Sequence, residues 1–347
     1  MKKISTVILA LIICLGVFSA ETPVITMSSV KPVGTSISFQ LTASADNTPI
    51  KVDFGDSLLI DKTIGTTATN ISGQFVDTAV VRIYGMGIVK LNCTYSNLST
   101  IDASGATALT ELICFNNKLV LLNVSKNKEL LHLDCNDNAL TELDVTSNTK
   151  LNILYCSGNK LTTLDVSKNI ALKNLNCSFN QLTTIDITNN AALTNLLCND
   201  NLLTALDFSS NGLLRSLGCN NNQLATLIIN KNYALTELNC SNNQLIVLDI
   251  SKNGALVKID YSNNQITSIE GDSNIDASKI EVYAHQNTIY LNLNSNSQIQ
   301  VFDVNGRMIT TKAVNAGTNN IQLQQKGVYL VSVSRKDGSK IHKVFIE

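Results

Sequence analysis

The sequence predicts an all-β-dominated solenoid, a stack of short coils, with a β-rich segment at each end. Three observations predict it. Cysteines recur every 21 residues, aliphatic residues keep the same phase on both sides of them, and the flanking segments alternate apolar and polar residues as strands do. A fixed period of this length indicates coils that bury their apolar side chains against one another. The repeat cysteines are Cys93, Cys114, Cys135, Cys156, Cys177, Cys198, Cys219 and Cys240.

The composition excludes several classes of function. Lys and Arg number 26 and Asp and Glu 27, a formal net charge of −1, which excludes a nucleic-acid binder driven by bulk charge. Three His and no Trp leave few groups for acid–base chemistry. The sequence also lacks an H-E-x-x-H motif, a phosphate-binding loop and any recognisable Ser–His–Asp pattern. We therefore expect a protein that is not an enzyme and that uses no cofactor.

Residues 1–20 have the composition of a secretory signal peptide. Lys2 and Lys3 precede the apolar run 7–18, and small residues stand before Glu21. The run is shorter than the ~20 apolar residues of a membrane-spanning helix. The sequence thus predicts export.

Each repeat places Leu two residues before the cysteine and Leu or Ile five residues after it. In an extended segment alternate side chains share a face, so Leu112 and Cys114 are expected inside the coil and Ile113 and Phe115 outside. An Asn at the following bend is expected to bond backbone groups of its own coil and of the next one. This Asn column comprises Asn117, Asn138, Asn159, Asn180, Asn201, Asn222, Asn243 and Asn264, and a second column runs from Asn127 to Asn274.

The cysteines allow three interpretations. A small thiol fits a narrow apolar core as a free, buried side chain. Disulfides would suit an exported protein with an even number of cysteines, but the Cβ atoms of stacked coils point the same way rather than toward each other. Metal binding or catalysis would need converging ligands or a nearby base, and the sequence has no C-x-x-C motif.

The motif L-x-x-L-x-[C/V]-x-x-N is nested twice in each repeat, and about nine repeats keep one phase. Residues 88–275 therefore resemble the leucine-rich repeat family, in the short nested form common in bacterial surface proteins. The resemblance implies a curved solenoid whose outward side chains bind a protein, peptide or glycan.

A column of carboxylates lies nine residues after most cysteines. One interpretation is a strip that binds divalent cations; the other is that each Asp caps its own turn. The column comprises Asp102, Asp144, Asp165, Asp186, Asp207 and Asp249.

The flanking segments are predicted to be β domains. Residues 21–87 should cap the open end of the solenoid, and 50–56 resemble the hairpin of PKD-like domains. Residues 276–347 contain six strand-like runs and strong turn signals, and they resemble the C-terminal sorting domain of type IX secretion cargo. The resemblance implies recognition by the type IX secretion machinery, passage across the outer membrane, and attachment to the cell surface or release. The alternative is a β-sandwich without a sorting role. The resemblance rests on Asp303, Asn305, Gly306, Arg307, Gly327 and Tyr329.

The outward positions of three consecutive early coils differ from the Asn and Ser that most coils carry. They predict an apolar and aromatic patch around one carboxylate and one imidazole, which is typical of a contact site. Our leading hypothesis is an adhesion or interaction module for an unknown protein or glycan; the alternative is a structural spacer without a ligand. The candidate residues are Glu111, Ile113, Phe115, His132, Asp134, Ile153 and Tyr155.

Overall fold

The computed structural model describes residues 22–266, 268–270, 281–285, 288–293, 296–303, 306–315, 317–325, 327–335 and 338–346. The predicted signal peptide, Asn274 and Asn305 lie outside these residues. All regular elements in the described ranges are β-strands, as predicted. No helix there is long and apolar enough to cross a membrane.

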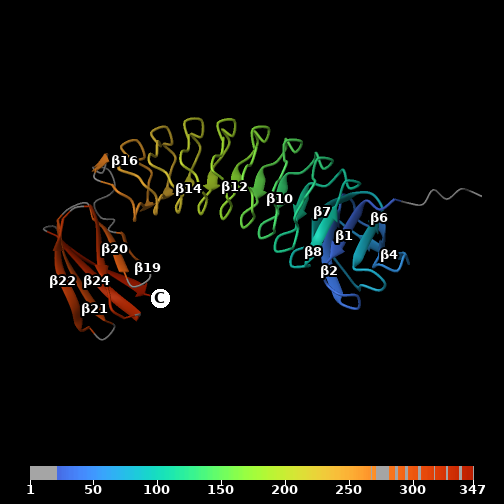
Figure 1. Ribbon diagram of the computed structural model, residues 1–347, viewed down its shortest axis with the longest axis horizontal. Helices are drawn as coiled ribbons and strands as arrows, with labels where there is room; N and C mark the ends of the chain where they lie inside the picture. The colour runs from blue at the N-terminus through green and yellow to red at the C-terminus, as the bar shows by residue number, and fades with distance from the viewer. Residues whose placement is uncertain are drawn as a thin grey trace, which may run out of the picture.

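The coils stack side by side in an arc, and their short strands line its inner face (Figure 1). The strands pair in parallel with no shift in register, so that Leu112, Leu133 and Leu154 occupy equivalent places. Three residues of strand per coil are enough because the chain bends away at both ends. These strands are β9 (Glu111–Ile113), β10 (His132–Asp134), β11 (Ile153–Tyr155), β12 (Asn174–Asn176), β13 (Asn195–Leu197), β14 (Ser216–Gly218), β15 (Glu237–Asn239) and β17 (Lys258–Asp260).

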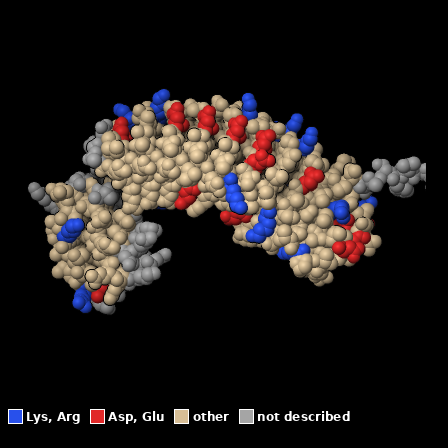
Figure 2. Space-filling model, in the orientation of Figure 1, with Lys and Arg blue, Asp and Glu red and all other residues tan. Residues whose placement is uncertain are grey.

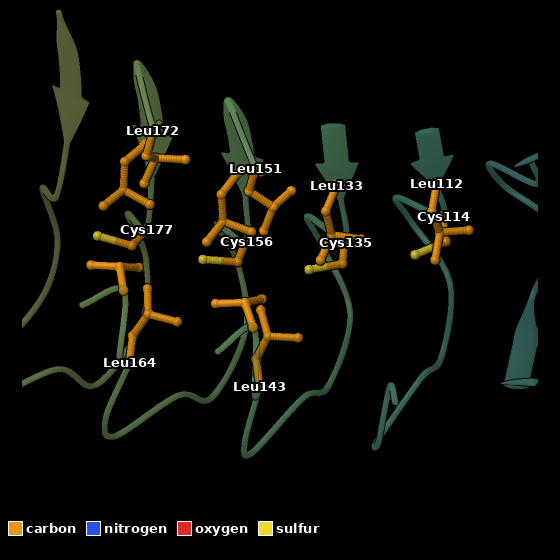
Figure 3. Packing of buried hydrophobic residues seen from close by; sticks show 14 of the residues in the cluster. Leu112, Cys114, Leu133, Cys135, Leu143, Leu151, Cys156, Leu164, Leu172 and Cys177 are labelled. Carbon is orange, nitrogen blue, oxygen red and sulfur yellow. The ribbon is translucent and has the colours of Figure 1, made fainter. Parts of the chain in front are cut away.

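The leucines and cysteines form the core, as the alternation predicts. Leu112 and Cys114 are fully buried, whereas Ile113 and Phe115 are half-buried on the outer side of the strand. In Figure 3 the cysteines of successive coils lie in a file, with their Sγ atoms pointing the same way. Tyr261 takes the cysteine position in the last coil and is also buried.

The N-terminal segment continues the solenoid rather than standing apart from it. Strand β2 of the cap pairs with β7 of the first coil in one sheet. In the other sheet, β1 of the cap pairs with β8 of the same coil. A single hydrophobic core runs from Ile25 to Tyr261, across the boundary we expected at residues 87 and 88. The strands are β1 (Ile25–Ser29), β2 (Ser36–Ala43), β3 (Thr48–Asp53), β4 (Ile60–Ile64), β5 (Thr69–Gln74), β6 (Val80–Tyr84), β7 (Ile88–Asn92) and β8 (Leu98–Asp102).

The C-terminal segment forms two antiparallel sheets around its own core, in the orders β19-β20-β23 and β22-β21-β24-β25. The turn between β21 and β22 carries the predicted signal, because Asp303 Oδ1 accepts the Arg307 N–H at 3.0 Å and Gly306 has a φ of 80°. A further short pair, β16 (Val247–Asp249) and β18 (Ser268–Glu270), lies near the end of the solenoid. The strands of the two sheets are β19 (Glu281–His285), β20 (Thr288–Leu293), β21 (Ser297–Asp303), β22 (Met308–Val314), β23 (Gly317–Gln322), β24 (Gly327–Arg335) and β25 (Gly338–Ile346).

Each Asn of the first column closes its coil with at least four hydrogen bonds. The Asn180 amide donates to the carbonyl oxygens of Cys156, Cys177 and Ser178 at 3.0, 3.1 and 3.0 Å. Its Oδ1 accepts the Leu161 N–H at 3.0 Å. The expectation that each Asn bonds the next coil was wrong in direction, because the partner coil is the preceding one. The backbone groups of the next coil form these hydrogen bonds with that coil's own Asn.

The second Asn column is only partly paired. The Asn169 amide donates to Val145 and Asn148 carbonyl oxygens of the preceding coil at 3.0 and 2.9 Å. Its Oδ1 is buried and has no hydrogen-bond partner among the described residues, and the same holds for Asn127, Asn148, Asn190, Asn211, Asn232 and Asn253. This column therefore contributes fewer hydrogen bonds per residue than the first.

The two columns predict different costs of truncation. Asn180→Ala removes four buried hydrogen bonds and should lower the free energy of unfolding by roughly 2 kcal/mol or more. Asn169→Ala removes two and releases an unpaired oxygen, so its cost should be clearly smaller. Denaturant titration measures both, with the exposed turn variant Asn189→Ala as the control that should change little. Equal costs for Asn180→Ala and Asn169→Ala would contradict this account.

Candidate ligand-binding surface

The structure brings the seven candidate residues together on the inner face of the arc. Register places Glu111, His132 and Ile153 in one row across β9, β10 and β11. Ile113, Asp134 and Tyr155 form the adjacent row. Phe115 lies just beyond the end of β9. All seven are half-buried, so the patch presents edges of side chains rather than fully exposed rings.

Ring contacts organise the patch. The His132 and Tyr155 rings meet edge to face with centroids 5.7 Å apart. The Phe115 ring meets that of Tyr95, from the preceding coil, in the same geometry at 4.7 Å. Such pairs hold side chains in fixed orientations, which lowers the entropy lost when a ligand binds.

The charges of the patch are unevenly compensated. Glu111 is paired with Lys90 at 3.0 Å. Burial raises the pKa of Asp134, against the opposing effects of the Asn136 N–H and of His132. His132 Nε2 is buried and has no hydrogen-bond partner in the described residues. The patch therefore contains a partly desolvated carboxylate, that of Asp134, which a ligand could pair.

The cysteines are not placed for surface chemistry. All eight are free thiols with no exposed surface. Burial raises the pKa of Cys93 and Cys177 to about 12. Thiolates are the reactive form, so these side chains act as small core residues.

We expect these thiols to react slowly in the folded protein. The chain beginning at Glu21 should give slow reaction with a chromogenic disulfide reagent at neutral pH, because the thiolate form is disfavoured and covered. After denaturation without reductant it should titrate eight thiols. Pre-reduced protein, treated in the same way, is the control. A count below six would indicate disulfides and contradict the packing role.

Each carboxylate of the Asp column caps its own turn. Asp144 Oδ1 accepts the N–H and the hydroxyl of Thr146 at 2.9 and 2.6 Å, and Asn123 makes the same backbone contact with Ser125 at 3.0 Å. Equivalent N–H contacts occur at Asp102, Asp165, Asp186, Asp207 and Asp249. Figure 2 shows acidic and basic side chains gathered along the outer edge of the arc.

The geometry of this column favours turn capping over cation binding. In the described part of the chain no three Asp, Glu, His or Cys side chains are grouped to hold a metal ion. A cleft of about 750 Å³ runs beside the column and includes Glu142, Asp144 and Asp165 in its lining. Glu142 and Asp144 line it from one coil and Asp165 from the next, and both Asp carboxylates are already engaged in their own turns.

The capping predicts a particular response to acid. Hydrogen bonds from the Thr or Ser hydroxyl and N–H lower the pKa of Asp144, Asp165, Asp186 and Asp207 below the ordinary value. Their contribution to stability is therefore complete above about pH 4 and is lost as the pH falls through the lowered folded-state pKa. The melting temperature should fall as the pH drops from 5 to below 3.

The matched variant replaces these four residues by Asn, which accepts the same N–H without titrating, as Asn123 does. The variant should lose less of its melting temperature than the parent over this range. Parallel curves for the two proteins would show that the column does not contribute to acid sensitivity.

Sequence reasoning missed a third column, two residues after each cysteine, where the chain turns out of the strand with φ between 51° and 65°. This left-handed conformation costs a residue with a large side chain about 1–2 kcal/mol, whereas Gly, Asn and Asp adopt it more readily. We call these residues the turn column. Tyr95 and Phe179 are its aromatic members, 63% and 58% exposed, and the others are Asn116, Asp137, Gly158, Asp200, Asn221, Asn242 and Asn263.

Comparison with known families identifies the C-terminal segment. Residues 285–347 match the model described as the secretion system C-terminal sorting domain. This segment is a type IX sorting domain. It indicates export to the cell surface or the extracellular space and an interaction with the secretion machinery. Of the residues that suggested this, Tyr329 is buried with its hydroxyl donating to Gln325 O at 2.9 Å, and Asp303 and Arg307 form the β21–β22 turn.

A solved structure identifies the fold of the solenoid. A leucine-rich repeat protein of Leptospira interrogans is 24% identical, with a TM-score of 0.51 over 53% of this chain and 51% of its own, and it shows the leucine-rich repeat fold. The functional domain of InlJ from Listeria monocytogenes, which includes a cysteine ladder, is 20% identical over 79% of this chain and 93% of that domain, with a TM-score of 0.41. YopM from Yersinia enterocolitica is 22% identical over 53% of this chain and 39% of its own, with a TM-score of 0.46. No curated protein sequence matches the chain.

Proposed function

We propose that this chain is a non-enzymatic cell-surface interaction module, delivered by type IX secretion, whose leucine-rich solenoid binds a protein or glycan. The observation that supports it best is the patch on β9, β10 and β11. Its rows of Glu111, His132 and Ile153 and of Ile113, Asp134 and Tyr155 are held in register on the inner face.

The surface chemistry fits recognition better than catalysis. The thiols are buried and the Asp column is engaged in turns, so the groups most suited to reaction are withdrawn from solvent or already bonded. The inner face instead offers half-buried aromatic rings and a partly desolvated carboxylate, and such groups dominate the energy of many interfaces. Attachment at the outer membrane would display this face toward the surroundings of the cell.

The alternative is a surface spacer without a ligand. The regular coils would serve a spacer equally well, since nine coils at strand spacing span about 40 Å. A spacer gives no reason, however, for the change from Asn and Ser to Ile, His, Phe and Tyr on three adjacent coils.

Binding by the purified chain tests the proposal. Residues 21–347 are applied to an array of glycans and to immobilised collagen, fibronectin and laminin. For whichever probe binds, Phe115→Ser and Tyr155→Ser should each weaken affinity by about 30-fold, since truncated hot-spot side chains cost about 2 kcal/mol or more. The melting temperature should stay within a few degrees because neither side chain belongs to the core.

The matched control is Tyr233→Ser, which removes an aromatic side chain that is 63% exposed in an outer loop. It should leave binding unchanged. If the parent chain binds none of the probes, the spacer is favoured. If the Phe115→Ser/Tyr155→Ser double variant binds with unchanged affinity, the patch is excluded as the contact site.

A further inference from the structure

Phe179 occupies a backbone position that suits it poorly. Its φ is 51°, in the left-handed region, and its side chain is 58% exposed. Tyr95 shares this conformation but packs its ring on Phe115. Phe179 has no ring contact of that kind among the described residues, although seven equivalent positions have Asn, Asp or Gly.

A fixed carboxylate lies one coil beyond Phe179. Asp200 Oδ1 accepts from the Asn221 amide at 2.8 Å, and Asp200 Oδ2 accepts from the Asn199 amide at 2.7 Å. The Ser178 hydroxyl, which is buried beside Phe179, donates to Asn199 Oδ1 at 2.6 Å and sets that amide's orientation. Each carboxylate oxygen thus has one donor from the protein and retains acceptor capacity for another.

A second carboxylate lies on the opposite side. Gly158, one coil before Phe179, has a φ of 65°, and a Cβ placed on it would collide with Asp137 Oδ1. Because Gly158 has no side chain, the Asp137 carboxylate can lie over the coil of Gly158, which is adjacent to the coil of Phe179. Along the turn column Phe179 stands one strand spacing, about 5 Å, from Asp200 and two spacings from Asp137.

This combination of groups favours one class of ligand. Two carboxylates repel polyanions, and no Lys or Arg of residues 22–266 forms an ion pair with Asp200. A quaternary or methylated cation would find one ring rather than an aromatic cage. Hydroxyl groups both donate and accept, and they suit carboxylate and amide partners alike. The ring offers an apolar face to C–H groups.

We propose that Asp137, Gly158, Phe179, Asn199, Asp200 and Asn221 form a carbohydrate site for a neutral oligosaccharide, the Phe179 site. The ring stacks on the C–H face of one sugar while Asp200 and Asn221 bond its hydroxyl groups. The inference rests on the proposed function of the solenoid as a binding module. It uses residues at the ends of the strands rather than the patch on β9 to β11.

Because Phe179 has a strained backbone conformation, a single variant can separate a loss of binding from a loss of stability. Phe179→Asn places a residue that adopts the left-handed turn readily, so the melting temperature should rise by about 2–4 °C while the stacking surface is lost. A variant that is more stable yet fails to bind cannot be dismissed as misfolded. The matched control is Ile170→Asn, which removes an apolar side chain that is 65% exposed in an outer loop.

The experiment measures calorimetric binding of residues 21–347 to neutral hexasaccharides of glucose, mannose, xylose and galactose. A sulfated glycosaminoglycan and a Lys-rich peptide represent the other classes. The parent should bind at least one neutral hexasaccharide. Phe179→Asn and Asp200→Ala should each weaken that binding at least tenfold, and Ile170→Asn should not.

Several results would overturn the proposal. They are no binding of a neutral hexasaccharide by the parent at millimolar concentration, binding only of the sulfated glycan or the basic peptide, unchanged affinity in Phe179→Asn, and a lower melting temperature in that variant. If the parent binds a matrix protein through Phe115 and Tyr155 but binds no sugar, the Phe179 site is excluded while the proposed function stands.

Discussion

Each coil depends on the Asn that pairs the backbone groups exposed where the chain leaves the strand. The bend points carbonyl and N–H groups into the stack, where no water reaches them, and an unpaired buried group of this kind costs about 1–3 kcal/mol. The Cys177 carbonyl oxygen receives amide hydrogens from both Asn180 and Asn201, so each Asn serves two coils at once. These Asn hydrogen bonds can form only if neighbouring coils have the same bend at the same position. This requirement explains why the period stays at 21 residues through the whole stack.

The narrow interior that this closure creates determines which side chains fit inside. Leucines fill its width, and beside them there is room for a thiol, which brings no hydroxyl or amide that would need a partner. Eight free cysteines in an exported protein are then a consequence of packing. Because the files of Cβ atoms are parallel (Figure 3), stacked thiols do not turn toward each other, although their coils are close. Any specific recognition must therefore come from the outside of the coils.

The sequence was sufficient for the features that follow from periodicity. Alternation along each strand predicted which residues lie inside, and the register placed Asp134 beside Ile113 and Tyr155. It was insufficient where periodicity carries no information. A translational repeat looks the same in both directions, so it could not show that Asn180 bonds the coil before it. Six strands were predicted in residues 276–347 and the described residues contain seven; β22 was missed because it is an edge strand with mostly exposed residues, which lacks the alternation of a half-buried strand. The exposure of the patch was overestimated because neighbouring rings cover one another.

The turn column shows how a repeat can carry function without losing its fold. At this position backbone conformation selects the side chain, since every coil needs a left-handed residue there to leave the strand. Asn, Asp and Gly meet that need at the lowest cost, and departures from them are therefore more informative than substitutions at freely variable surface positions. At Tyr95 the ring contact with Phe115 offsets the strain of the left-handed conformation. Phe179 has no such contact among the described residues, yet on the next coil Asp200 is held by the Asn199 and Asn221 amides. A strained and exposed aromatic residue beside an ordered polar network is an outlier of the kind that clusters at functional sites, which is the reason for the proposal of a binding site there.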